Sequence, residues 1–206
     1  MDIQFYGANC VSVTYKNARI VLDDNLADVG GKSVVKPEDV ALYTGPHGAS
    51  KGRLSFDSPG EYEVSDISVV GIAARAHLDE PKTLNATMFK LVVGDTTVLV
   101  TGHVYPELSE AQLENIGICD VLIVPVGGNG YTVDPVGALK LIKEIEPKLV
   151  IPTHYNDKDL NLPVPQQELS NALKELGMEP KETVAKLKLK GHELTDVTQL
   201  VLLEKS

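Results

Sequence analysis

The sequence predicts an α/β domain in which strands and helices form stacked layers. Three observations point to it: short apolar strand-like runs separated by turn residues, a few amphipathic helical stretches among them, and histidines that recur just after strands. A chain of 206 residues falls within the size of one domain, and no linker or low-complexity tract divides it. We therefore expect a single domain over residues 1–206.

The strand-like runs occur along most of the chain. Short runs of apolar and β-branched residues bounded by Gly, Asn, Asp or Lys are typical of strands. Residues 86–102 read as a hairpin that turns at Gly94 and Asp95. Residues 186–190 alternate Lys and Leu, which an edge strand guarded by charge explains better than an anion site does. The other expected strands are residues 3–7, 10–15, 18–24, 40–44, 67–74, 120–128, 148–153 and 198–204.

Three stretches carry helix signals. Residues 109–117 begin with a serine followed by an acidic residue and end at a glycine, which are start and stop signals. Residues 134–147 have a proline near the first turn and apolar residues at helical spacing. Residues 163–178 place three leucines on one face and close at a glycine. Helices interspersed with strands in one chain favour the layered α/β class.

Composition excludes several classes of function. The net charge of −10 and the pI near 4.9 argue against a nucleic-acid surface, which needs a basic stripe. No apolar stretch approaches the roughly 20 residues that span a bilayer, so no membrane partner is expected. Met1 and Asp2 run directly into a strand-like run without a signal-peptide pattern, and two cysteines are too few for a disulfide framework. We expect a cytoplasmic protein.

Four of the five histidines follow predicted strands. In layered α/β folds, ligand sites collect in loops just beyond strand ends, and imidazole is a good ligand for zinc, iron, nickel and copper. Convergence on one metal is one interpretation; the alternative is that each is a polar loop residue or a half-buried ring. His192 lacks a comparable context and is set apart. The four are His47, His77, His103 and His154.

Longer stretches resemble a known family. The chain is similar, from about residue 3 to 204, to the metallo-β-lactamase fold superfamily, in its bacterial zinc-dependent hydrolase branch related to the ascorbate-6-phosphate lactonases. That resemblance implies a four-layer αββα sandwich, with Asp23 as the structural aspartate that ends a strand. The stretches that carry it are IQFYGANCVSV, RIVLDD, SPGEYEVSDISVVGI, CDVLIVPVGGNGYTVD and EPKLVIPTHYN.

The family's metal-binding signature is altered in this sequence. The family loop reads Thr/Ser-His-x-His-x-Asp-His, and the corresponding slots run from Thr44 to Ser50. Only His47 is retained, because Gly, Ala and Ser occupy the other ligand positions. His77 and His154 match later family ligands, whereas His103 replaces the aspartate that normally bridges two metals. The loop is a metal loop reduced to one ligand.

The resemblance implies at most one metal ion. Ala49 has no donor and Ser50 is a poor zinc ligand, so a dinuclear centre is not expected. Three histidines plus water form a known catalytic zinc set, which here would be His47, His77 and His103. His154 would then be a fourth ligand that closes a structural site, or a base. The cofactor is therefore one zinc or other divalent transition metal, or none.

The remaining candidate residues are chosen because they lie near the predicted strand ends and histidines in the sequence. His154 and Asp23 are the catalytic candidates, and Asp23 is better placed to orient a ligand histidine or the loop backbone than to act as a base. The Gly-rich stretch 127–132 could cradle an anion, although a simple turn explains it better. The candidate substrate-binding residues are Asn129, Tyr131, Tyr155 and Asn156.

Three functions remain open from the sequence. The first is a metal-dependent hydrolase, at most mononuclear, that acts on a small ester, lactone or phosphoester. The second is a catalytically inactive member of the fold that keeps the pocket as a ligand-binding module. The third is a structural subunit of a homo-oligomer or hetero-oligomer. The surviving histidines favour the first, and the loss of the loop aspartate at Ala49 favours the second.

Overall fold

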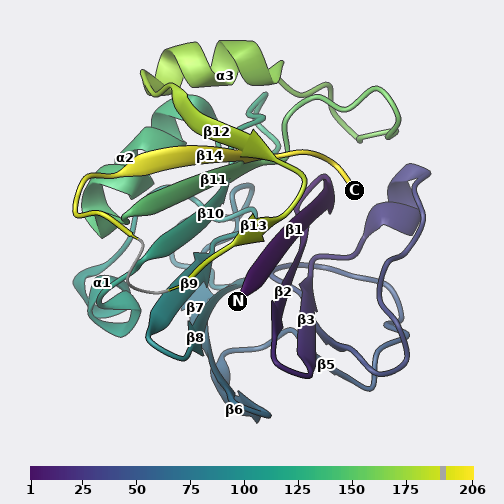
Figure 1. The fold of residues 1–206 in the computed structure, drawn as a ribbon. Coiled ribbons are helices and arrows are strands. Elements are labelled where there is room, and N and C mark those ends of the chain that lie inside the picture. The colour runs from purple at the N-terminus through teal and green to yellow at the C-terminus, as the bar shows by residue number, and fades with distance from the viewer. Residues whose placement is uncertain (191–193) are drawn as a thin grey trace.

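In the computed structural model, which describes residues 1–190 and 194–206, the strands form two sheets that face each other (Figure 1). His192 lies outside the described residues. The first sheet runs β13 (Leu187–Lys188), β1 (Asp2–Gly7), β2 (Cys10–Tyr15), β3 (Ala18–Leu22), β4 (Val40–Leu42) and β5 (Leu54–Phe56). The second runs β12 (Pro180–Val184), β14 (Gln199–Leu203), β11 (Leu149–Thr153), β10 (Val121–Pro125), β9 (Thr96–Val100), β8 (Ala86–Val93), β7 (Ile67–Ala74) and β6 (Gly60–Val64).

Each sheet combines antiparallel and parallel pairs. In the first sheet β1, β2 and β3 are antiparallel neighbours, and β4 and β5 continue in parallel from β3. In the second sheet β6 to β9 form an antiparallel meander, and β10, β11, β14 and β12 run parallel beyond β9. The hairpin expected over 86–102 is confirmed, with Val93 opposite Thr96 across the turn. The edge-strand interpretation of 186–190 is confirmed as well, because β13 is the terminal strand of the first sheet in the described part of the chain and pairs with β1.

Alternating side chains of the buried strands build two cores. On β10, Val121 and Ile123 point into the core between the sheets, whereas Leu122 and Val124 face the helices. This follows from the two-residue period of a strand, which sends successive side chains to opposite faces. The parallel strands are covered on both faces, and this explains why β10 and β11 consist of buried residues throughout.

Three α-helices cover the outer face of the second sheet (Figure 1): α1 (Glu110–Ile116), α2 (Pro135–Ile145) and α3 (Leu169–Leu176). The expected signals operate as predicted at α1, where Ser109 and Gln112 form a capping box, and at α2, where Pro135 opens the first turn. The outer face of the first sheet is covered by loops and by one short 3₁₀ helix, η1 (Leu26–Val29), packed on Val21 and Tyr43. The expected αββα sandwich is confirmed, with a thin outer layer on this side.

The third helix is shorter than the sequence pattern indicated. The expected range was 163–178, but α3 begins at Leu169. Pro163 and Pro165 keep the preceding residues extended, since the residue before a proline is disfavoured in helical geometry. The segment instead docks on the sheet, where the Gln167 N–H donates to the Gly127 carbonyl. The strands β5, β6 and β12 were not predicted, and all three lie at or next to sheet edges with largely exposed residues.

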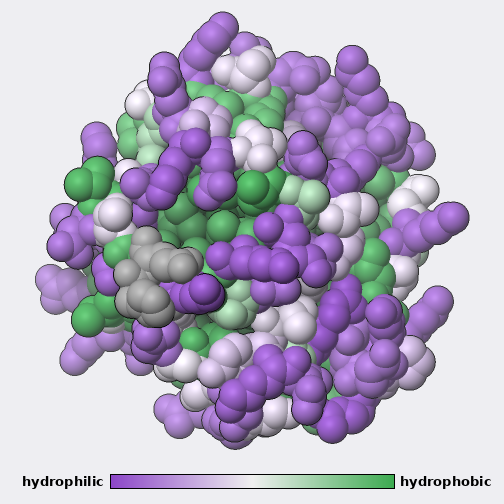
Figure 2. Space-filling model, in the orientation of Figure 1, coloured by the Kyte–Doolittle hydropathy of each residue, from purple (hydrophilic) through white to green (hydrophobic). Residues whose placement is uncertain are grey.

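The exterior is largely hydrophilic (Figure 2). Hydrophilic residues dominate the face drawn in Figure 2, and hydrophobic surface shows through near its centre. None of the helices in the described part of the chain is both long and apolar enough to cross a membrane.

Candidate functional site

A cavity of about 380 Å³ opens beyond the carboxyl ends of β4, β7, β9 and β11. We call it the strand-end cavity. Its polar lining includes Asn9, Asp23, Asn25, Thr44, His77, Asp79, His103, Tyr131 and His154, and its apolar lining includes Ala8, Val29, Pro46, Ala76, Leu78, Ala86, Leu162 and Pro163. A larger groove of about 720 Å³ between β7 and α1 contains none of the candidate site residues. The chemistry predicted for strand ends therefore gathers in the strand-end cavity.

His103 and His154 form a close pair in this cavity. Their ring centroids are 4.5 Å apart in an edge-to-face arrangement, and the Tyr131 ring lies 5.2 Å from His103 and 5.9 Å from His154. Burial lowers the pKa of His103 to about 3, helped by the proximity of His154, and burial lowers the pKa of His154 to about 4. Both rings are therefore uncharged at pH 7.

The backbone around His154 is tightly fixed. His154 is 3% exposed, has a left-handed φ of 52°, and donates its N–H to the Ala8 carbonyl at 2.8 Å. A Cβ atom at Gly127 would lie 2.0 Å from the His154 carbonyl oxygen and 2.2 Å from Gln166 Oε1. Only glycine fits at position 127, and its absent side chain makes room for the Gln166 amide beside His154.

His77 reaches the same cavity from the loop after β7. Its backbone N–H donates to the His103 carbonyl at 2.7 Å, which links the loops after β7 and β9. Its Nδ1 atom is buried and has no hydrogen-bond partner among the described residues, as is also true of Nδ1 of His154. Burial lowers the pKa of His77 as well. The structure thus brings together three of the four predicted histidines.

His47 is not brought to the cavity lining. Its ring stacks on Tyr43, with centroids 3.8 Å apart and an interplanar angle of 11°. Nδ1 lies 2.5 Å from the Gly48 carbonyl oxygen, and Nε2 lies 3.3 Å from Asp57 Oδ2. Both ring nitrogens are therefore engaged by groups in the loops after β4 and β5.

Asp23 fixes the start of the loop after β4. Its Oδ1 accepts the Thr44 N–H at 2.7 Å and its Oδ2 accepts the Thr44 hydroxyl at 2.7 Å. Burial raises the pKa of Asp23 to about 6, and the two bonds from Thr44 oppose that shift. Because both oxygens are engaged by Thr44, the carboxylate orients the loop backbone, one of the two roles expected for it.

The donors, as they lie, do not fit a metal ion. A zinc site in a protein generally takes at least three side-chain ligands. Among residues 1–190 and 194–206, no group of three or more His, Cys, Asp or Glu side chains lies together so that it could hold one. His47 faces Asp57, and the Asp23 oxygens are taken by Thr44. The predicted shell of four histidines is not assembled here.

Three predicted substrate-binding residues lie outside the cavity lining. Tyr155 packs its ring against Phe5 at 5.8 Å in the core. Asn156 donates its side-chain amide to Glu168 at 2.7 Å, and Asn129 donates to the Pro165 carbonyl. Of the four candidates, only Tyr131 lines the cavity.

The Gly-rich stretch 127–132 is a turn. The N–H groups of Tyr131 and Thr132 donate to the Gly128 carbonyl and the Gly128 N–H donates to the Val133 carbonyl, at distances of 3.1 to 3.4 Å. Such inward bonds leave these three groups unavailable to an anion. The turn interpretation is favoured over the anion cradle that the composition had left open.

Sequence reasoning missed Asn9, which lines the cavity from the turn between β1 and β2. Its Oδ1 accepts from the Thr153 hydroxyl at 3.0 Å, and its buried Nδ2 has no hydrogen-bond partner in the described part of the chain. A polar residue in a tight turn between two buried strands was the available signal. The contact with Thr153 spans 144 positions, which no local pattern reveals.

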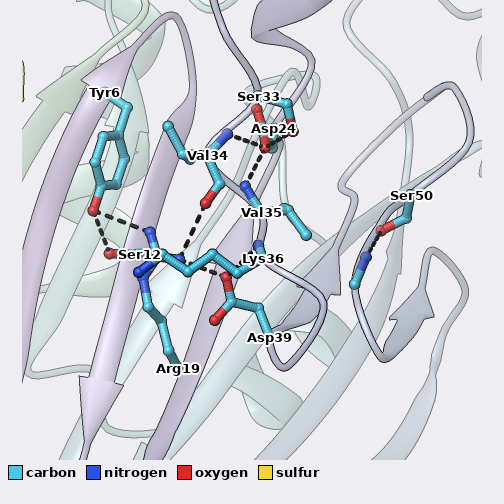
Figure 3. Close-up of polar contacts among 11 residues, drawn as sticks. Tyr6, Ser12, Arg19, Asp24, Ser33, Val34, Val35, Lys36, Asp39 and Ser50 are labelled. Carbon is cyan, nitrogen blue, oxygen red and sulfur yellow. Dashed lines mark hydrogen bonds and ion pairs between the residues drawn. The ribbon is translucent and has the colours of Figure 1, made fainter.

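A separate polar network holds the long loop between β3 and β4 against the first sheet (Figure 3). Asp24 Oδ2 accepts from the Ser33 hydroxyl and from the N–H groups of Val34 and Val35, at 2.7 to 2.8 Å. Arg19 pairs with Asp39, and the Asp39 carboxylate also accepts the Lys36 N–H. This network anchors the loop next to Asp23, whose side chain lines the cavity.

Comparisons with known proteins agree with this architecture. A protein of the metallo-β-lactamase superfamily from Thermotoga maritima superposes with a TM-score of 0.75 at 26% identity, covering 98% of each chain. The metallo-β-lactamase fold protein YhfI from Bacillus subtilis superposes with a TM-score of 0.61 at 8% identity, covering 99% of this chain and 96% of that one. The second likeness concerns the fold alone.

Curated relatives match over shorter stretches. A "UPF0173 metal-dependent hydrolase" from Carboxydothermus hydrogenoformans is 40% identical over 72 residues, which are 35% of this chain and 31% of that protein. One from Pyrococcus abyssi is 25% identical over 156 residues, 74% of this chain and 68% of that protein. The chain covers about a third of the length of the first of these relatives. The model of the β-lactamase superfamily domain matches residues 2–154, about three quarters of the chain, and the chain therefore belongs to the β-lactamase superfamily.

Proposed function

We propose that this chain is a hydrolase of the metallo-β-lactamase fold that acts on a small molecule bound in the strand-end cavity. The observation that carries the proposal is the meeting of His77, His103 and His154, from three strand ends, at one cavity. Family membership supports it, and so do the relatives from Carboxydothermus hydrogenoformans and Pyrococcus abyssi, which are called metal-dependent hydrolases. Ester, lactone and phosphoester bonds are the candidate targets.

Metal dependence enters this proposal only through those relatives. We infer at most one bound ion, because Ala49 and Ser50 stand where the family's second metal has its ligands and cannot hold it. Because the donors do not converge as they lie, no step of the reaction is assigned to a metal.

The chain's own groups bind and orient the substrate. Imidazoles with pKa values of about 3 and 4 are neutral at pH 7. His103 and His154 can therefore form hydrogen bonds to a substrate as uncharged rings. They are weak proton acceptors, because an efficient general base has a pKa near the working pH. The Tyr131 ring packs against both imidazole rings. In this proposal the pair positions a carbonyl or phosphoryl oxygen and does not abstract a strongly held proton.

A second candidate is a ligand-binding module without turnover. The specific observation in its favour is that the described residues do not form a three-ligand metal group. The engagement of both His47 nitrogens by Gly48 and Asp57 points the same way.

Metal content and turnover together distinguish the two candidates. Protein purified without added metal is analysed for metal by mass spectrometry, then assayed on ester, lactone and phosphodiester panels with and without saturating zinc, manganese and iron. The hydrolase proposal expects turnover that falls at least about 100-fold in His103→Gln. His47→Gln, the matched control, should retain wild-type turnover. Inactivity on every panel would favour the binding module, and a large loss in His47→Gln would show that the loop after β4 contributes to the reactive site.

A further inference from the structure

Two buried atoms behind the strand-end cavity are complementary, and neither has a hydrogen-bond partner among the described residues. One is the ring nitrogen Nδ1 of His154, and the other is the amide oxygen Oε1 of Gln166. His154 is 3% exposed and Gln166 is 6% exposed, so bulk water does not reach either atom. A neutral imidazole nitrogen can carry a proton and donate it, whereas an amide oxygen can only accept.

The orientation of the Gln166 amide is fixed by its nitrogen. Nε2 donates to the Val164 carbonyl at 2.7 Å, a bond that only the N–H₂ side of the amide can form. Oε1 is therefore the side of the amide left over. A Cβ atom at Gly127 would lie 2.2 Å from Oε1 and 2.0 Å from the His154 carbonyl oxygen, so the amide oxygen lies beside the backbone of His154.

The segment that carries Gln166 is bonded to the loops after β10 and β11. The Gln167 N–H donates to the Gly127 carbonyl at 2.9 Å, and the Gln167 carbonyl accepts the Asn156 N–H at 2.8 Å. These two backbone bonds join the residue next to Gln166 to the turn after β10 and to the chain just beyond His154. The amide is thus held in place by the same loops that carry the cavity lining.

The hydrogen bonding of the His154 ring agrees with this placement. Burial lowers the pKa of His154 to about 4, and hydrogen bonds to its own carbonyl and to the Gln166 side chain oppose that fall. An acceptor opposes such a fall where it receives a ring N–H. Nδ1 is the ring nitrogen nearer the backbone, so the His154 carbonyl and the Gln166 oxygen beside it both face Nδ1.

Nε2 lies on the opposite side of the ring and is the nitrogen open to the cavity. His154 lines the cavity, and with respect to the described residues its Nε2 atom is neither hydrogen-bonded nor buried without a partner. A neutral imidazole carries a single ring proton, so a proton held on Nδ1 leaves a lone pair on Nε2. The partner of the buried nitrogen therefore decides what the exposed nitrogen can bind.

We propose that Gln166 is a positioning residue: its Oε1 accepts the Nδ1 proton of His154 and so presents an unprotonated Nε2 to the strand-end cavity. The group that fits against this nitrogen is a hydrogen-bond donor, either the attacking water of a hydrolysis or an O–H or N–H group of the bound molecule. The role of His154 in orienting that water rests on the proposed function and refines it. The protonation of the ring does not depend on turnover.

NMR of the neutral ring measures where the proton lies. The whole chain, labelled with ¹⁵N in its histidines, is studied at pH 7 in chelator. Correlations from the carbon-bound ring protons to the two ring nitrogens distinguish a protonated nitrogen from an unprotonated one, and His154→Gln identifies the signals by their loss. We expect the proton on Nδ1. A wild-type His154 that carries its proton on Nε2 overturns the proposal.

Substitutions at Gln166 test its part in holding the proton. Gln166→Met keeps the size of the side chain and removes the acceptor, so the ratio of the Nδ1–H form to the Nε2–H form should fall at least about fivefold. Gln166→Glu retains an acceptor and should leave the proton on Nδ1. Gln167→Met, the matched control one residue away, should not change the ratio.

A folded Gln166→Met protein that keeps the wild-type ratio overturns the proposal, because the His154 carbonyl alone would then hold the proton. Circular dichroism melts identify any variant that fails to fold. The wild-type measurement stands without the variants.

Turnover distinguishes a positioning role from a purely structural one. Where the wild type turns over a substrate, Gln166→Met should lower kcat about tenfold and change KM less than about threefold, because the oriented water matters in the transition state. Gln166→Glu should recover most of that kcat. A Gln166→Met protein that is less stable but has the wild-type kcat would show a structural role only and would remove the positioning role.

The outcomes also separate the protonation of His154 from the proposed function. A proton on Nδ1 that depends on Gln166, in a protein inactive on every substrate panel, keeps the assignment of Gln166 and removes the hydrolase proposal. Turnover by a protein whose His154 carries its proton on Nε2 does the reverse.

Discussion

The loop after β4 and the loop after β9 both reach the strand-end cavity, but the fold holds them very differently. At Gly45, an added Cβ atom would meet no heavy atom within 4 Å among the described residues. At Gly102, it would lie 2.0 Å from Thr44 Oγ1. The first loop has open space around it and its histidine faces Asp57, whereas the second is packed and its histidine faces His154.

This difference coincides with the pattern of ligand replacement. The loop after β4 is where three family ligand positions carry Gly45, Ala49 and Ser50. The loops after β7 and β11 keep the family's histidines, the loop after β9 carries His103 in place of the family's aspartate, and the loops after β7 and β9 are tied together by the bond from the His77 N–H to the His103 carbonyl. The substitutions that remove a metal-ligating side chain thus lie in the open loop, where a new side chain meets little structural penalty. The packed side of the rim is therefore where we place the function.

The largest expected effect is on stability, when alanine replaces a glycine in each of the two loops, at Gly102 and at Gly45. Gly102→Ala should lower the free energy of unfolding by about 3–5 kcal/mol, because φ is 62° and the new Cβ collides with Thr44, which two hydrogen bonds to Asp23 hold in place. Gly45→Ala, the matched control, should change it by less than about 0.5 kcal/mol. Urea unfolding measures both. Equal stabilities for the two variants would remove the distinction between an open and a packed loop.

A smaller effect should appear in the pH dependence of stability. In the unfolded chain both His103 and His154 titrate near pH 6.5, and in the folded protein near 3 and 4. Between pH 6.5 and about 4 only the unfolded state takes up these protons, so the free energy of unfolding falls as the pH falls. The raised pKa of Asp23 opposes this, since the folded state binds its proton below about pH 6, but two rings outweigh one carboxyl.

Urea unfolding at pH 7 and pH 4.5, in chelator, measures that dependence. We expect a loss on the order of 3 kcal/mol between these pH values in the wild type. His103→Gln should reduce the loss, because it removes the ring with the more strongly lowered pKa. His47→Gln should leave the loss unchanged. A loss that is the same in all three proteins would show that the buried pair does not control acid stability.

Much of the fold was predictable because its signals are local. The hairpin over 86–102 depends on adjacent residues, and Gly94 with a φ of 65° turns it where expected. The strand-then-histidine pattern also placed His77, His103 and His154 correctly at one rim, because the ends of neighbouring strands in a sheet meet at one edge.

The rest of the site depends on contacts that sequence spacing does not encode. Tyr155 directly follows His154, yet the left-handed backbone at His154 turns the chain and sends the Tyr155 ring to Phe5 in the core. Asn9 lies at the cavity beside Thr153, and its hydrogen bond with that distant residue holds it there. His47 follows β4 as predicted, but it does not line the cavity, and its ring contacts Tyr43 and Asp57.

The smallest expected effect concerns that histidine. His47→Ala removes a stacking contact with Tyr43 and a partly exposed pair with Asp57, so it should lower the free energy of unfolding by no more than about 1 kcal/mol. It should leave the NMR signals of His103 and His154 in place, because neither ring touches this loop histidine in the structure. Urea unfolding and imidazole spectra of the variant measure the two effects. Shifted signals from the buried pair, with stability unchanged, would mean that the loop after β4 swings into the cavity in solution, and the open side of the rim would then have to be counted as part of the site.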